Sequence, residues 1–159
     1  MKTYLVLFFS LFLYTASAQS PEYITYDQLE AKINKQDDTL RIVNFWATWC
    51  KPCVEELPDI EKISKEYKGK KVKVLLVSLD FKSKIETNLV PFIQKNNITS
   101  EVVVIDQNNA NEWINKISKH WSGSIPATLF IFPDGKRNFH EGKLTYDDLK
   151  AKIEANIKP

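Results

Sequence analysis

The chain has 159 residues, which is enough for one domain with a hydrophobic core. Its 22 basic and 20 acidic residues leave a formal net charge of +2. A balance this even does not favour binding to nucleic acid or to an anionic membrane surface, because both attract strongly basic proteins. We therefore expect a globular domain that binds neither of them.

The first residues have the pattern of a secretory signal peptide. Lys2 supplies a positive charge, residues 5–14 form an apolar run, and residues 16–18 are small. The run is short for a helix that spans a bilayer, and an uncleaved N-terminal anchor is the alternative. No cysteine stands directly after the run, which excludes a lipid anchor on an N-terminal cysteine of the mature protein. We expect cleavage between Ala18 and Gln19 and a mature protein outside the cytoplasm.

One domain is expected over residues 19–159, with strands and helices in alternation. Alternation of this kind predicts parallel strand pairs, and a terminal hairpin adds antiparallel strands. We expect an α/β fold with a central mixed β-sheet flanked by helices on both faces. In chain order the pattern predicts a loose lead-in over 19–25, a helix over 26–36, a strand over 40–46, a helix over 55–67, a strand over 72–79, a helix over 83–96 that is broken or kinked at Pro91, a strand over 102–105, a helix over 109–121, strands over 127–132 and 136–140, and a helix over 146–157.

Two cysteines, Cys50 and Cys53, stand two residues apart between a predicted strand and a predicted helix. This spacing and position are typical of a thiol–disulfide redox site. A purely structural disulfide that closes so short a loop would stabilise little. A structural zinc site needs four ligands, and only His120 and His140 remain as nitrogen ligands far downstream. We expect no metal and no cofactor other than the redox-active cysteine pair.

The helix that follows the first cysteine has two distinct faces. Cys50 is expected at its N-terminus, where the helix dipole favours a thiolate and lowers the thiol pKa below about 8.5. Cys53 is expected one turn in, against the core, and Pro52 fits the first turn because it needs no N–H there. The predicted inward stripe is Cys53, Leu57, Ile60, Ser64 and Tyr67, and the predicted solvated face is Glu55, Asp59, Lys62 and Glu66.

Glu56 and Pro126 are further candidates. Glu56 lies three residues after Cys53, so a carboxylate partly removed from water could take the proton that Cys53 must lose. It could equally be an ordinary acid in the first turn of a helix. Pro126 stands directly before a predicted strand, but pattern alone does not establish a cis peptide bond there.

Residues 44–53, Asn-Phe-Trp-Ala-Thr-Trp-Cys-Lys-Pro-Cys, resemble the active-site segment of the thioredoxin superfamily. Pro58 matches the family's helix proline, and Ile125-Pro126 with residues 130–136 resemble its cis-proline loop and hairpin. The resemblance implies that Pro126 is cis and faces the cysteines. It also implies that backbone groups of Ile125 pair with substrate. The candidate substrate-binding residues are Trp49, Lys51, Pro52, Ile125 and Pro126.

Two departures from plain thioredoxins place the chain closer to the exported TlpA and ResA type. Asn44 stands where plain thioredoxins carry a buried Asp, and an extra helix and strand fit before the cis-proline loop. In that type the acid aligned with Glu56 serves the active-site cysteines. The resemblance implies a monomeric reductase of exported protein disulfides, apocytochrome c among them, supplied with electrons by a membrane thiol donor.

Other functions on the same residues remain open. A disulfide oxidase or isomerase would use the same cysteines, and Lys51 beside Cys50 would favour an oxidant by stabilising the thiolate. A metallochaperone on this fold would want a longer cysteine spacing and a suitably placed histidine. A peroxidase of the related peroxiredoxin type needs a threonine where Ala47 stands. A non-catalytic binding module would not need two intact cysteines.

Overall fold

The computed structural model describes residues 20–156. The predicted signal peptide, its cleavage site and the end of the last predicted helix lie outside this range. A six-stranded mixed sheet forms the middle layer, in the order β1-β4-β3-β2-β5-β6. The strands are β1 (Glu22–Ile24), β2 (Leu40–Trp46), β3 (Val72–Ser78), β4 (Glu101–Ile105), β5 (Ala127–Ile131) and β6 (Arg137–Glu141).

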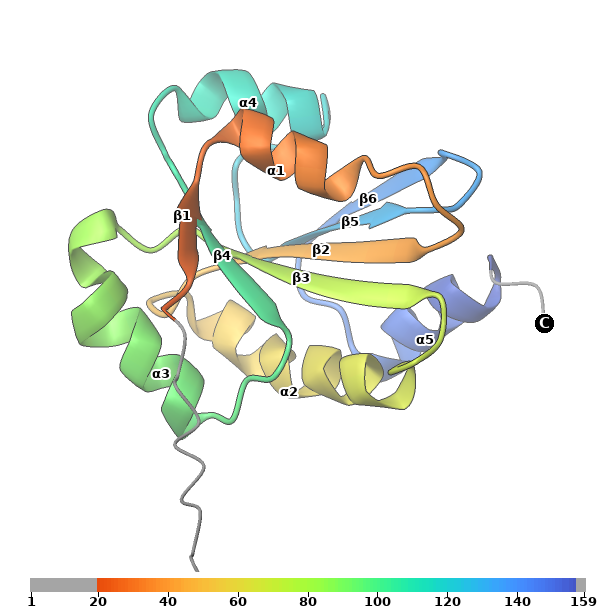
Figure 1. The fold of residues 1–159 in the computed structure, drawn as a ribbon, viewed down its shortest axis with the longest axis horizontal. Coiled ribbons are helices and arrows are strands. Elements are labelled where there is room, and N and C mark those ends of the chain that lie inside the picture. The colour runs from red at the N-terminus through yellow and green to blue at the C-terminus, as the bar shows by residue number, and fades with distance from the viewer. Residues whose placement is uncertain (1–19, 157–159) are drawn as a thin grey trace, which may run out of the picture.

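Helices cover both faces of this sheet, as Figure 1 shows. α1 and α4 lie on one face, and α2 and α5 lie on the other, with α3 beside α2. Their bounds are α1 (Tyr26–Ile33), α2 (Lys51–Glu66), α3 (Val90–Lys95), α4 (Ala110–Ile117) and α5 (Tyr146–Glu154). The predicted fold class is confirmed, including the extra helix and strand, α3 and β4, between β3 and the cis-proline loop. No helix within residues 20–156 is both long and apolar enough to cross a bilayer.

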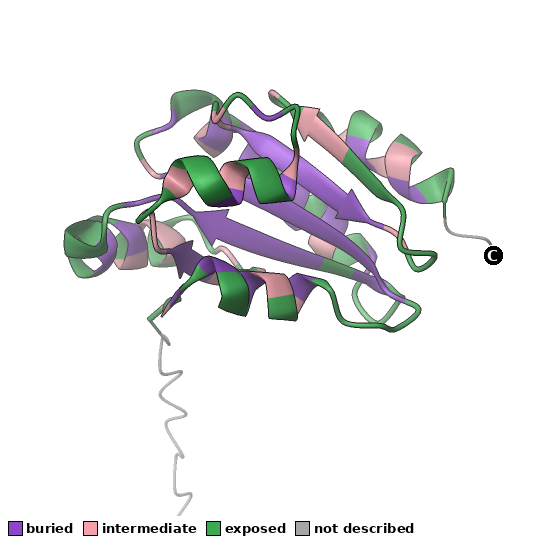
Figure 2. Ribbon diagram, turned by 90° about the horizontal axis from the view of Figure 1, so that it is seen from above, coloured by how far each residue is buried: buried purple, intermediate pink, exposed green. Residues whose placement is uncertain are grey.

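β2 is the central strand of the sheet. It pairs in parallel with β3 and antiparallel with β5, so that Phe45 lies opposite Val77 on one side and Ala127 on the other. All seven residues of β2 are buried, which explains its near-continuous apolar sequence. Figure 2 shows the buried sheet between helices whose outer faces are exposed.

Successive aromatic residues of β2 point to opposite faces of the sheet. The ring of Phe45 packs 4.6 Å from that of Trp121 and 6.3 Å from that of Trp113, between the sheet and α4. The ring of Trp46 packs 5.5 Å from that of Phe92 on α3. One strand therefore joins the hydrophobic cores of both helical layers immediately before the cysteines.

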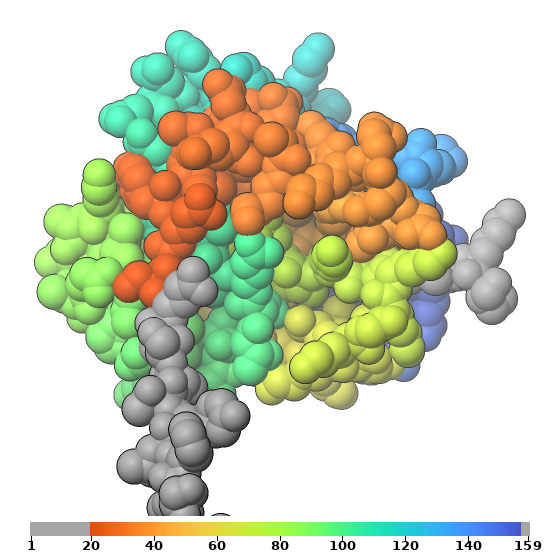
Figure 3. Space-filling view, viewed as in Figure 1, coloured from red at the N-terminus to blue at the C-terminus, as the bar shows by residue number. Residues whose placement is uncertain are grey.

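Several of the element boundaries predicted from the sequence are wrong. The lead-in contains β1, which pairs in parallel with β4, a partner some 80 residues away that local pattern does not reveal. In the space-filling view the orange residues of β1 and α1 lie beside teal β4 and green α3 (Figure 3). The helix predicted over 109–121 ends at Ile117, because Ser118 is extended. Trp121 is nevertheless buried, so its ring reaches the core from a loop.

The segment predicted as one helix over 83–96 has three parts. A 3₁₀ turn (Lys82–Lys84) and a π turn (Ile85–Leu89) precede α3. Pro91 stands in the first turn of α3, where its missing N–H is tolerated. The irregular part therefore lies before the proline, and the break or kink predicted at Pro91 is a change of helix type just before it.

The predicted faces of α2 are correct except at Ser64 and Asp59, which are both half-buried. Glu61, which was assigned to neither face, is buried at 5% exposure. The carboxylate of Glu61 accepts hydrogen bonds from the Thr99 N–H, the Thr99 hydroxyl and the Ser100 N–H. Burial raises the pKa of Glu61, but these hydrogen bonds outweigh burial and hold it below the ordinary value. Glu61 thereby attaches α2 to the start of β4.

Candidate active site

The two cysteines lie where β2 passes into α2. Cys50 is the N-cap residue of α2, and Pro52 stands in the first turn, as predicted. Cys50 and Cys53 form a disulfide, and the N–H of Cys53 donates to Cys50 Sγ over 3.3 Å. Cys50 is 6% exposed and Cys53 is 1% exposed. The more accessible sulfur is therefore at the helix N-terminus, where the dipole favours negative charge.

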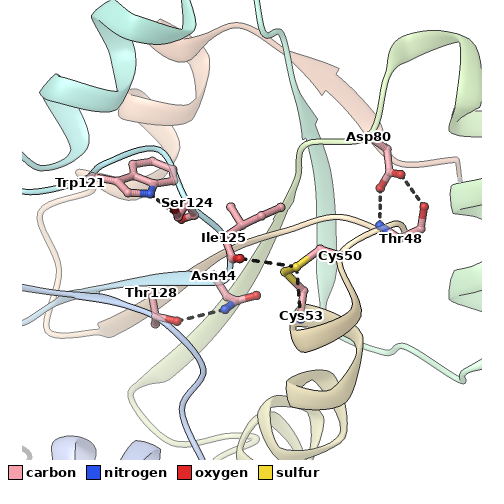
Figure 4. The surroundings of a disulfide bond; sticks show 9 residues. All are labelled: Asn44, Thr48, Cys50, Cys53, Asp80, Trp121, Ser124, Ile125 and Thr128. Carbon is pink, nitrogen blue, oxygen red and sulfur yellow. Dashed lines mark hydrogen bonds between the residues drawn. A yellow bond between two sulfur atoms is a disulfide. The ribbon is translucent and has the colours of Figure 1, made fainter.

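The cis-proline loop faces this disulfide across the edge of the sheet. The Ile125–Pro126 peptide bond is cis, which confirms what the family resemblance implied. The carbonyl oxygen of Ile125 lies 3.6 Å from Cys50 Sγ, as Figure 4 shows. Ile125 is half-buried and Pro126 is buried. The loop before β5 and the N-terminus of α2 thus form the two sides of one site.

Three predicted substrate-binding residues surround the cysteines on the solvent side. Trp49 is 61% exposed, and Lys51 and Pro52 are also exposed. Trp49 is therefore available for contact with a partner, whereas the tryptophan three residues earlier in β2 is fully buried.

Asn44 lies on β2 behind the disulfide. Its amide nitrogen donates to the hydroxyl of Thr128 over 3.0 Å, and both side chains are buried (Figure 4). An amide cannot exchange a proton with a thiol at neutral pH. Proton transfer at this site therefore requires a different group.

Glu56 is the buried carboxyl group that lies nearest in the chain to Cys53. Cys53 and Glu56 lie three residues apart on α2, and Glu56 is 0% exposed. One carboxylate oxygen accepts a hydrogen bond from the Leu144 N–H over 3.3 Å, and the other has no hydrogen-bond partner among residues 20–156. Burial raises the pKa of Glu56 to about 7, against the smaller opposing effects of that hydrogen bond and of Lys143.

The sequence analysis missed a buried carboxylate that holds the turn before Cys50. Asp80, just after β3, is 2% exposed. It accepts hydrogen bonds from the Thr48 N–H over 3.0 Å and from the Thr48 hydroxyl (Figure 4). The Ser78 hydroxyl also donates to it, over 2.8 Å. β2 and β3 are adjacent and parallel, so polar residues that follow them meet at one edge of the sheet. This rule could have predicted the contact.

Within residues 20–156, no group of three or more His, Cys, Asp or Glu side chains is arranged to hold a metal ion. The chemistry of the site consists of two sulfur atoms, one buried carboxyl group with a raised pKa, and the backbone of the cis-proline loop.

Comparison with known proteins places the chain in a family. The pattern of the AhpC/TSA family matches residues 17–137. The chain belongs to this family. Among solved structures, the thioredoxin-related protein from Neisseria meningitidis serogroup B superposes with a TM-score of 0.66 at 24% identity, over 78% of this chain and 89% of that one. The similarity confirms the thioredoxin-like fold.

Two characterised proteins are similar to this chain in sequence, and their names refer to thioredoxin-type redox proteins. The chain is 35% identical over 128 residues to thiol-disulfide oxidoreductase ResA of Oceanobacillus iheyensis, covering 79% of this chain and 61% of that protein. It is 32% identical over 114 residues to the thioredoxin-like protein YneN of Bacillus subtilis, covering 71% of this chain and 62% of that protein. The predicted resemblance to the ResA type is confirmed, and the chain spans about three fifths of the length of these relatives.

The raised pKa of Glu56 predicts a pH-dependent stability. The folded state holds the proton more tightly than the unfolded state, whose pKa is near 4.5, so this contribution to stability is present at low pH and is lost as pH rises through about 7. Between pH 5 and pH 8 the oxidised wild-type protein should lose about 2.5 kcal/mol relative to Glu56→Gln. Urea unfolding of both proteins at the two pH values measures the difference, and parallel pH profiles would contradict it.

Proposed function

We propose that the protein is a thiol–disulfide oxidoreductase that reduces disulfides of exported proteins through Cys50 and Cys53. The observation that carries this proposal is the Cys50–Cys53 disulfide at the N-terminus of α2, 3.6 Å from the Ile125 carbonyl oxygen. The names of the curated relatives support it. The chain spans only part of the first of these relatives, so its own activity needs a direct test.

The reaction starts from the reduced protein. The Cys50 thiolate, favoured by the helix dipole, attacks one sulfur of the substrate disulfide and forms a mixed disulfide, and one substrate thiolate leaves. Cys53 then loses its proton and attacks Cys50 Sγ. The Cys50–Cys53 bond forms, the mixed disulfide breaks, and the second substrate thiol leaves. Two electrons pass from the protein dithiol to the substrate.

Glu56 is proposed as the group that takes the proton from Cys53. Both residues are buried on α2, so bulk water has little access to the thiol. A carboxyl group whose pKa is about 7 can accept and release a proton near neutral pH. The free carboxylate oxygen of Glu56 leaves a site for that proton.

Substrate is proposed to bind across the exposed residues Trp49, Lys51 and Pro52 and against the cis-proline loop. The backbone of Ile125 would pair with an extended segment of the substrate, as in strand addition. The proposed substrates are exported proteins with disulfides, apocytochrome c among them. A reductase outside the cytoplasm needs an electron source, and a membrane thiol donor is proposed for that role.

A trapping experiment tests the roles of the two cysteines. Cys53→Ser removes the resolving thiol, so the mixed disulfide on Cys50 should accumulate when the reduced variant meets oxidised insulin. Cys50→Ser should trap far less, because Cys53 is nearly inaccessible. Non-reducing gels and mass spectrometry of the adduct give the measurement. Equal trapping by both variants would contradict the assignment, and failure of the reduced wild type to reduce insulin would contradict the function itself.

Glu56→Gln tests the proposed proton transfer. Wild-type insulin reduction should rise with pH through about 7, as Glu56 ionises, whereas the variant should lack that inflection and be slower on the order of 10²-fold at pH 7.5. Glu55→Gln, an exposed residue in the same turn, is the control and should retain the wild-type profile. A Glu56→Gln profile that coincides with the wild type would leave Glu56 no role in the reaction.

The direction of electron flow is tested in cells. A reductase must be kept reduced by its donor, so alkylation of free thiols after acid quenching should find Cys50 and Cys53 mostly reduced. Gel shift of the alkylated protein reports the ratio. A mostly oxidised pair would contradict the reductase and support an oxidase or isomerase on the same site.

A further inference from the structure

The loop between α4 and β5 determines where Ile125 lies. It runs from Ser118 to the cis-proline without regular secondary structure, yet it must hold the Ile125 carbonyl oxygen 3.6 Å from Cys50 Sγ. A displacement of about 1 Å at such a position is enough to slow a reaction that depends on alignment. The contacts that hold this loop therefore matter to the reaction proposed above.

A carboxylate from the edge strand holds the middle of this loop. Glu141 is the last residue of β6 and pairs with Ala127, the first residue of β5. Its two oxygens accept separate hydrogen bonds from Ser122, one from the backbone N–H over 2.8 Å and one from the hydroxyl over 2.6 Å. The hydrogen bond from the Ser122 hydroxyl, with that from its N–H, holds the pKa of Glu141 below its ordinary value.

From Ser122 the contacts continue toward the site. The Ser122 hydroxyl oxygen lies 2.9 Å from that of Ser124 and accepts a hydrogen bond from the Ser124 N–H over 3.3 Å. The Ser124 carbonyl oxygen accepts a hydrogen bond over 2.8 Å from the indole N–H of Trp121, whose ring is buried against Phe45 (Figure 4). The next residue is Ile125. The chain of contacts thus runs from Glu141 to the residue beside the disulfide.

The end of the loop at Pro126 is held by Gly142, the residue that follows Glu141 at the end of β6. The N–H of Gly142 donates to the carbonyl oxygen of Pro126 over 2.8 Å. Gly142 has a φ of +112°, a conformation that residues with a Cβ rarely adopt. Two consecutive residues at the end of β6 therefore contact both the middle and the end of the loop.

The geometry points to Glu141 as a positioning residue that, through Ser122, holds the cis-proline loop in the place where Ile125 meets Cys50 and the substrate. This inference rests on the proposed function. Glu141 is exposed and touches neither cysteine, so it acts only through the loop. Hydrogen bonds at an exposed site contribute little to global stability. Loss of Glu141 should therefore affect substrate binding far more than unfolding.

The test compares Glu141→Ala, Glu141→Gln, Ser122→Ala and the Glu141→Ala/Ser122→Ala double variant. With insulin as substrate, Glu141→Ala should raise KM about tenfold. Glu141→Gln keeps an acceptor for the Ser122 N–H and should restore most of the loss. The double variant should be no worse than Glu141→Ala, because both changes break the same contact. Glu101→Ala, an exposed glutamate at the opposite end of the strands, is the control.

Two further readouts separate positioning from a general structural effect. The urea midpoint of each variant and the rate at which iodoacetamide alkylates Cys50 in the reduced protein should match the wild type. An unchanged KM in Glu141→Ala, additive losses in the double variant, or a KM change that follows the urea midpoint would each overturn the inference.

Hydrogen exchange gives a test that does not depend on activity. Amide exchange of Ser124 and Ile125 should accelerate several-fold in Glu141→Ala and stay at the wild-type rate in Glu101→Ala. Unchanged exchange would overturn the inference even if insulin is a poor substrate. A wild-type protein that fails to reduce insulin but shows the exchange effect would contradict the proposed function and leave the loop contact supported.

Discussion

The pairing of β2 with β3 on one side and with β5 on the other determines the arrangement of the whole site. Because β2 and β3 are parallel, both end at the same edge of the sheet, and because β5 is antiparallel, it begins there. The turn before Cys50, the segment around Asp80 and the cis-proline loop therefore converge. No one of these three segments could form the site alone, and the backbone ladder of a fully buried strand fixes their separation.

The proton chemistry of the site depends on where a carboxylate can be buried. Position 44 on β2 holds a neutral amide that is satisfied by Thr128, so β2 supplies no proton acceptor beside the disulfide. Glu56 on α2 is buried instead, with one oxygen bonded to the Leu144 N–H from the segment before α5. Burial raises the pKa of Glu56 because it outweighs the opposing effects of that hydrogen bond and of Lys143. The packing of α5 against α2 thus sets the acidity of a group in the redox site.

The sequence predicted what depends on local pattern. The strand over 40–46, the helix that starts at Cys50 and the burial of Cys53 against the core follow from apolar periodicity and spacing. The position of Glu56 beside the apolar stripe was also readable, but its pKa was not, because that depends on Leu144 and on complete burial. The cis bond before Pro126 came from family resemblance and not from physical pattern.

Contacts between distant residues were not predictable from pattern. β1 is only three residues long, and it is a strand because it pairs with β4. Ser122 and Glu141 are 19 residues apart, with nothing in the intervening sequence to link them. Trp121 fits the apolar period of a helix although it lies in a loop, because its ring packs in the same hydrophobic core as Trp113 of α4. Periodicity records which side chains are buried, and it does not record which backbone carries them.

Burial of Glu56 has a consequence for the reduced protein. In the oxidised protein Cys53 has no proton to exchange, and the pKa of Glu56 is raised chiefly by burial. Reduction creates a thiol three residues away on the same buried helix face, so two acidic groups share one region of low dielectric. The proposed transfer of the Cys53 proton to Glu56 therefore takes place away from bulk water. It requires Glu56 to be ionised when Cys53 attacks, and burial, which raises the pKa of Glu56 to about 7, makes that condition depend on pH near neutrality.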